Sequence, residues 1–147
     1  MNDPIAIPPL PRGATRLFDE APGRVPGGAW KPPVSAADAA RAATADAFAL
    51  SETARCATLD ANDAWKQGIR GEETRAHETA AFQHGEASAA HEHAMELHAG
   101  AVEEDPDHAA EHGFMEFLHR HGFRTHLEAR AEHEVARDGA EMEEGRR

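Results

Sequence analysis

The chain has few of the large apolar residues from which protein cores are built. Isoleucine, leucine, valine and phenylalanine together number 20 of 147 residues, and the formal net charge at pH 7 is −12. This combination is typical of disordered or partner-dependent chains. Alanine is abundant, but it favours helix while burying little surface. We therefore expect thin, elongated helices stabilised by association rather than a compact monomer with a thick core.

Other absences narrow the class of protein. Cys56 is the only cysteine, which rules out an intramolecular disulfide framework. The first residues lack the cationic start and apolar run of a signal peptide. No stretch approaches the roughly twenty apolar residues of a membrane span. We expect no membrane partner, and a cytoplasmic protein or one assembled into a particle such as a virion.

Charge is distributed unevenly between the two halves of the chain. Residues 1–70 contain eight acidic and eight basic side chains, whereas residues 71–147 contain nineteen acidic and seven basic ones together with all eleven histidines. A surface of this sign repels nucleic-acid phosphates, so we expect no nucleic-acid partner. Basic protein surfaces, divalent cations or simple solubility explain the acidic half better.

The N-terminal segment is rich in proline. Eight of the nine prolines lie between Pro4 and Pro33, and proline disrupts regular helices and central strands. We read residues 1–34 as an extended or disordered arm. One interpretation is an inert tail; the other is an arm that wraps a protein partner or a neighbouring subunit. In the second interpretation the contacts come from Leu10, Leu17, Phe18 and Trp30.

The rest of the chain predicts helices. Ser35 is a good N-cap, with Asp38 three residues later, so an alanine-rich helix is expected over residues 35–70. Gly68 and Gly71 leave open whether residues 35–98 form one helix or two. Trp65 is expected in the core of this part.

Two further helices are expected to form an acidic, histidine-rich hairpin over residues 71–138. Gly100 is a candidate C-cap near residue 98, and Asp105-Pro106-Asp107 is a strong new helix start. The turn is therefore placed at about 99–106, and a short connection predicts antiparallel neighbours. Residues 139–147 are expected to fray. The predicted fold class is all-α: an elongated alanine-rich helix plus an antiparallel helical hairpin, preceded by the extended proline-rich arm.

Eight histidines share one seven-residue register, which is broken once, at Asp105. A spacing of seven residues is two helical turns, so these imidazoles form a stripe along each helix. They are His77, His84, His91, His98, His112, His119, His126 and His133.

The largest apolar side chains of both hairpin helices fall roughly opposite the stripe, which predicts that they form the core and that the histidines face solvent. The alternative is a second packing seam, between chains of a higher oligomer. It is supported by alanines three residues after each of the first four histidines, and histidine would there act like other polar coiled-coil core residues. The core candidates are Phe82, Leu97, Phe114, Phe117, Leu118 and Val135, and the seam alanines are Ala80, Ala87, Ala94 and Ala101.

The histidines also suggest transition-metal chemistry, because imidazole suits zinc, nickel and copper, with carboxylates as further ligands. Close pairs and one Glu-x-x-His pair supply candidates, but no H-E-x-x-H motif or cysteine-rich finger is present. The candidate ligands are His91, His93, His108, His112, Glu116, His119 and His121. A pH response is a further hypothesis, because acidic surroundings should favour protonated imidazole and mild acid would then promote association or a partner switch.

No nucleophile constellation or phosphate loop is visible, so no catalytic residue is assigned. We expect a non-enzymatic assembly or interaction protein that joins a larger multi-subunit complex, such as a virion-type particle, through helix packing and the wrapping arm. Its partners would be other proteins or further copies of itself, with a homo-oligomer favoured. The alternative is a module for zinc, nickel or copper storage, delivery or sensing, and a metal-dependent helical-bundle enzyme comes third.

Overall fold

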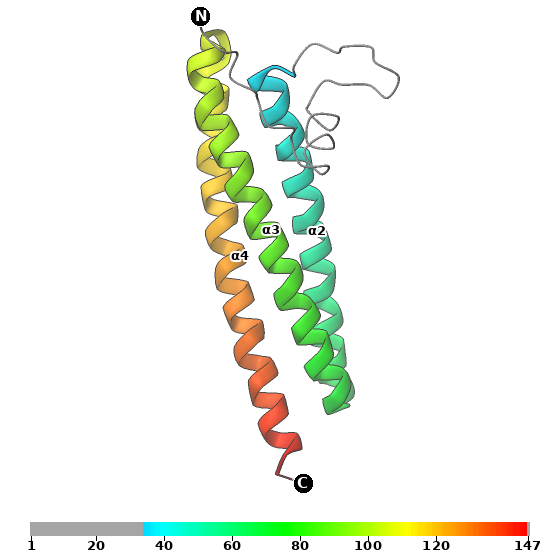
Figure 1. Cartoon of the computed structure of the whole chain (residues 1–147). Coiled ribbons are helices and arrows are strands. Elements are labelled where there is room, and N and C mark those ends of the chain that lie inside the picture. Colours follow the sequence, from blue (N-terminus) through cyan, green and yellow to red (C-terminus); the bar gives the residue numbers. More distant parts are fainter. Residues whose placement is uncertain (1–33, 147) are drawn as a thin grey trace, which may run out of the picture. The chain divides into compact units, whose positions relative to one another are not determined.

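The computed structural model describes residues 34–146, which form three long helices and no strand. Helix α2 spans Ala36–Gln67, α3 spans Arg70–Glu104 and α4 spans Ala109–Glu144, with a short 3-10 turn, η1, at Pro106–His108 (Figure 1). The all-α class is confirmed. The arm residues Leu10, Leu17, Phe18 and Trp30 lie outside the described residues.

The first helix break falls at Gly68. This residue has φ +71°, a backbone conformation that glycine adopts without steric cost. Its N–H donates to the Ala64 carbonyl at 3.2 Å, which closes the end of α2, and α3 begins two residues later. Residues 35–98 therefore contain two helices rather than one.

Two expected helix ends are wrong. Helix α3 does not stop at Gly100 but continues to Glu104. It ends there because Pro106 disfavours helical backbone at Asp105, the residue before it. The segment from residue 139 is not frayed, because α4 is helical through Glu144. There Ala140 is buried, and Glu143 pairs with Arg70 of α3 at 3.0 Å, which holds the last turns against the neighbouring helix.

Helix α3 packs along both of its neighbours (Figure 1). It runs antiparallel to α2 and to α4, as expected for the hairpin. The buried apolar residues of the described range are all alanines. Two seven-residue rows of them are completely buried, on α2 and on α3, and small side chains let the backbones approach closely. The rows are Ala40, Ala47, Ala54 and Ala61, and Ala80, Ala87, Ala94 and Ala101.

The expected phenylalanine core is wrong. Phe82, Phe114, Phe117 and Val135 are each 60% exposed or more. Trp65, also expected in the core, is 61% exposed. Leu97 and Leu118, the other core candidates, are partly buried, and Leu97 packs against Ala43, Ala47 and Ala94. The phenylalanines are exposed because the seven-residue rows of alanine and histidine occupy the facing positions of the helices. The helices in residues 34–146 contain no apolar stretch long enough to cross a membrane.

Close approach is tightest at Gly122 on α4. A Cβ atom added there would lie 2.6 Å from Cε1 of His91 on α3, whereas one added at Gly113 would have no neighbour within 4 Å. The two glycines precede Phe123 and Phe114 in identical His-Gly-Phe triplets. They therefore form a matched pair with different roles: only Gly122 makes room for a histidine ring of the next helix.

We expect Gly122→Ala to lower the free energy of unfolding by about 1 to 3 kcal/mol, because the His91 ring must move. Gly113→Ala should be neutral or raise it by up to about 1 kcal/mol through helix propensity. Urea titration followed by circular dichroism measures both. Equal effects of the two substitutions would contradict the close packing at Gly122.

Candidate functional site

The eight histidines of the seven-residue register are buried, each no more than 9% exposed. The expectation that they face solvent is therefore wrong. The alternative prediction is a packing seam in a higher oligomer. The histidines do form a seam, but it lies within one chain, between α3 and α4, with α2 closing its side.

Facing histidines of α3 and α4 form four pairs. In each pair the two Nδ1 atoms lie within hydrogen-bond distance, so one of them donates an N–H to the other. Because the helices are antiparallel, the first histidine of α3 meets the last of α4. The pairs are His77 with His133 at 2.9 Å, His84 with His126 at 2.8 Å, His91 with His119 at 2.8 Å, and His98 with His112 at 2.9 Å.

Three hydroxyl groups of α2 join these pairs to one another. Thr44, Ser51 and Thr58 are also spaced by seven residues, and each oxygen lies 2.8 to 3.0 Å from Nε2 atoms of two histidines, one from each of the other helices. Thr44 bridges His98 and His119, Ser51 bridges His91 and His126, and Thr58 bridges His84 and His133. We call these eight histidines and three hydroxyl residues the ladder.

The ladder is one unbroken series of hydrogen bonds from His112 to His77. Rings of successive pairs also stack, for example His91 and His126 with centroids 5.4 Å apart. The series ends where the seven-residue row of α2 no longer carries a hydroxyl, at Ala37 and Trp65. Between His77 and His98 it extends over ~32 Å of helix.

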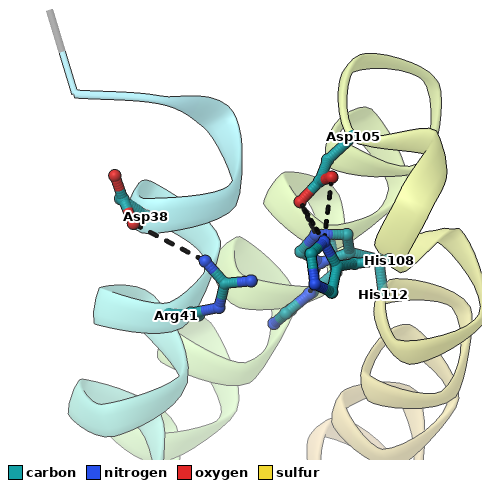
Figure 2. A network of polar contacts seen from close by, with 6 residues as sticks. Asp38, Arg41, Asp105, His108 and His112 are labelled. Carbon is teal, nitrogen blue, oxygen red and sulfur yellow. Dashed lines mark hydrogen bonds and ion pairs between the residues drawn. The ribbon is translucent and has the colours of Figure 1, made fainter.

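The end at His112 has an unusual neighbour. His112 is completely buried, and its Nε2 has no hydrogen-bond partner. The Asp105 carboxylate lies close by, with Oδ2 3.5 Å from that Nε2 (Figure 2). Asp105 is also the residue that interrupts the histidine register, so the missing histidine is replaced by a carboxylate at the end of the ladder. A hydrogen bond from His108 lowers the pKa of Asp105 and keeps it ionised.

Burial lowers the pKa of six ladder histidines and so favours their neutral form. It lowers the pKa of His84 and of His91 to about 4, with a further contribution from neighbouring imidazoles. Burial also lowers the pKa of His98, His119, His126 and His133.

The acidic surroundings expected to favour protonation have the smaller effect. Glu111 and Glu132 of α4 oppose the lowering at His98 and His133, while Arg41 of α2 adds to it at His98. His108, which is exposed and bonded to Asp105, is the contrasting case, because its pKa is raised. The expected protonation is therefore wrong for the six histidines whose pKa is lowered, since desolvation exceeds the attraction of the carboxylates.

The candidate metal ligands are dispersed. His91 and His119 meet as a pair, and His112 meets His98, which was not a candidate. His93, His108 and His121 are exposed, and Glu116 pairs with Arg120. Within residues 34–146 no group of three or more histidine, cysteine or carboxylate side chains could hold a metal ion. A metal site stays a prediction without support from the geometry.

Sequence reasoning missed the three hydroxyl residues. Their signal was present, because Thr44, Ser51 and Thr58 repeat every seven residues on a helix otherwise dominated by alanine. Because the hydroxyl row of α2 has the same seven-residue period as the histidine rows of α3 and α4, the three rows can lie against one another.

Comparison with protein-family models, with curated proteins and with solved structures gives no match. The geometry of this chain is therefore the guide to its function.

A groove of about 690 Å³ opens beside the half of the ladder that ends at His77. Arg55 and Asn62 of α2 and Glu132 of α4 line it together with four ladder histidines. These histidines are His77, His84, His126 and His133. At this end, ladder rings border a water-accessible space, although each ring is itself largely buried.

Acid should unfold the helices cooperatively. The folded-state pKa values of six ladder histidines are lowered, so in the unfolded chain these histidines take up protons below about pH 6.5 that they do not bind in the folded chain. Stability is full above that pH and falls as the pH drops toward 4, the value to which the pKa of His84 and His91 is lowered. Each neutral buried histidine removes up to about 1.4 kcal/mol per pH unit in this window.

Urea titrations at pH 7.5, 6.5 and 5.5 measure this loss. His121→Gln, at an exposed histidine outside the ladder, should show the same pH dependence as the unmodified chain. His91→Gln should show a shallower one. A free energy of unfolding independent of pH would contradict the neutral, buried ladder.

Proposed function

We propose that the protein is a non-enzymatic assembly subunit that associates with further copies of itself to build a larger multi-subunit particle. The observation that carries this proposal is the inverted distribution of apolar residues. Alanine and histidine fill most of the space between the helices, whereas many of the large apolar side chains are exposed. Exposed apolar patches of this kind mark association surfaces.

The outward apolar residues are found on all three helices. On α4, Phe114 and Phe117 lie three residues apart on one face and are 60% and 64% exposed. Phe82 on α3 and Phe48 on α2 are 63% and 50% exposed. Burial of a phenylalanine side chain contributes about 1.5 to 3 kcal/mol, so a few such contacts between copies stabilise an assembly.

The interior supports the same function. A seam of alanine and hydrogen-bonded histidine fixes the register of the helices but buries little apolar surface. Association through the outward side chains supplies the missing stabilisation, and low pH, which protonates histidines released from the ladder, favours disassembly. This is the opposite of the association in mild acid that composition alone suggests.

Light scattering on size-exclusion eluate at pH 7.5 tests the proposal. We expect the mass of a defined oligomer, and a lower mass for Phe114→Ser combined with Phe117→Ser. Glu128→Ser, at an exposed position of the same helix, is the matched control and should keep the oligomer. A monomer at every concentration, with unchanged helicity, would overturn the proposal.

An arm deletion and a zinc addition, measured in the same way, distinguish a wrapping arm and a metal-binding module from assembly through the helices alone. Deletion of residues 1–34 should abolish complex formation while helicity is retained, if the arm wraps a neighbouring subunit. The mass should be the same with EDTA and with stoichiometric zinc. A reversible change with zinc would instead favour the metal-binding module.

A further inference from the structure

The protons of the ladder can be counted, because nearly every imidazole nitrogen in it faces one defined neighbour. A neutral imidazole carries a single N–H, on Nδ1 or on Nε2. Each Nδ1–Nδ1 bond needs one proton between the two rings. In every pair, therefore, one ring carries its proton on Nδ1 and the other on Nε2.

The hydroxyl groups transmit this choice from pair to pair. Each hydroxyl has a single proton and faces two Nε2 atoms. Unless it donates to a carbonyl of its own helix, it accepts from an N–H on one side and donates to a bare nitrogen on the other. For example, if His126 donates to Ser51, then Ser51 donates to His91, and the proton of His91 must lie on Nδ1. The direction of one bond thus sets the direction of the next.

Asp105 selects the direction. Its ionised carboxylate lies 3.5 Å from the buried Nε2 of His112 and favours a proton there. Thr44 and Ser51 also lie within reach of the Ala40 and Ala47 carbonyls of their own helix, at 3.0 and 2.8 Å. A neutral ladder in which either hydroxyl donated to its carbonyl would leave Nε2 of His112 bare beside the carboxylate. The carboxylate therefore opposes every such reversal.

We propose that the ladder is a directional proton relay, which takes up a proton at His77 and releases one at His112 toward Asp105. In its resting state the four histidines of α3 carry their protons on Nδ1 and the four histidines of α4 carry theirs on Nε2. This activity lies beyond assembly and does not depend on it.

The relay needs no oxidant and no cofactor. A proton from water binds the bare Nε2 of His77, whose Nδ1–H then passes to Nδ1 of His133. The Nε2–H of His133 passes to Thr58, and the Thr58 hydroxyl proton passes to Nε2 of His84. The same three transfers repeat through Ser51 and Thr44 until the Nε2–H of His112 leaves toward Asp105. One proton enters and one leaves, and every bond formed is matched by one broken.

Both ends of the relay have access to water. His77 lines the groove beside α2 and α4. At the other end the Asp105 side chain is 25% exposed and bonds His108, which is 52% exposed (Figure 2). Passage of one proton leaves all eight tautomers inverted, so the rings and hydroxyls must turn back before a second proton follows.

Nitrogen-15 NMR of the histidine rings in the full chain at pH 7.5 tests the relay, since it distinguishes the two neutral tautomers. We expect Nδ1–H at His77, His84, His91 and His98, and Nε2–H at the four histidines of α4. Asp105→Asn should remove this preference along the whole ladder, because an amide can donate as well as accept. The change should reach His77, ~32 Å of helix away from the pair beside Asp105.

Ser51→Ala cuts the relay in the middle. The preference should remain at His91, His98, His112 and His119 and be lost at the other four histidines. Thr58→Val, which replaces the hydroxyl by a methyl group of similar size, should remove the tautomer preference only at His77 and His133. Thr53→Ala, on the exposed side of the same helix, should change nothing.

Loss of the preference only at His112 and His98 in Asp105→Asn would overturn the proposal. So would unchanged tautomers at His77 and His84 after Ser51→Ala, or mixed tautomers throughout the unmodified chain.

Discussion

The hydrogen bond between facing Nδ1 atoms of two neutral imidazoles is the interaction on which the rest of the structure depends. It requires two helices at a fixed separation and register, since the four bonds are all 2.8 to 2.9 Å long. It also requires that the rings share protons without carrying charge, because two adjacent imidazolium ions would repel and would have no acceptor between them. The second nitrogen of each ring then needs its own partner, which the α2 hydroxyls supply for six of the eight.

The small residues follow from this requirement. Helices that meet through imidazole pairs also need short side chains beside the rings, and the fully buried alanine rows of α2 and α3 meet that need. Gly122 meets it where even a Cβ atom would collide with His91. Buried hydrogen-bonded polar groups contribute modestly to net stability, but each costs about 1 to 3 kcal/mol when its partner is removed. The ladder therefore specifies one register of the three helices strongly. Stabilisation by burial of large apolar side chains is left to the outer surface.

Much of the fold could be predicted from the sequence. Ser35 and Asp105-Pro106 give helix ends through local backbone chemistry, and the short turn gives the antiparallel hairpin. The sequence leaves the break at Gly68 open, because a glycine inside a helix weakens it without ending it. The period of the histidines predicts a stripe, but not which way it faces. Large apolar residues ordinarily mark the core, and here Phe82, Phe114 and Phe117 are outside. The direction in which the histidines face depends on tertiary contacts. A row of hydroxyls on one helix meets two rows of imidazoles on the others, so that these polar residues are buried together with their hydrogen-bond partners.

The most direct test of this account is detection of the Nδ1–H···Nδ1 bond itself. Scalar coupling between the two nitrogens of His91 and His119, measured across the hydrogen bond in nitrogen-15-labelled protein at pH 7.5, requires that they share a proton. We expect a resolved coupling in this pair and in the other three pairs. Independent rings that exchange their protons freely with water and show no coupling would contradict it.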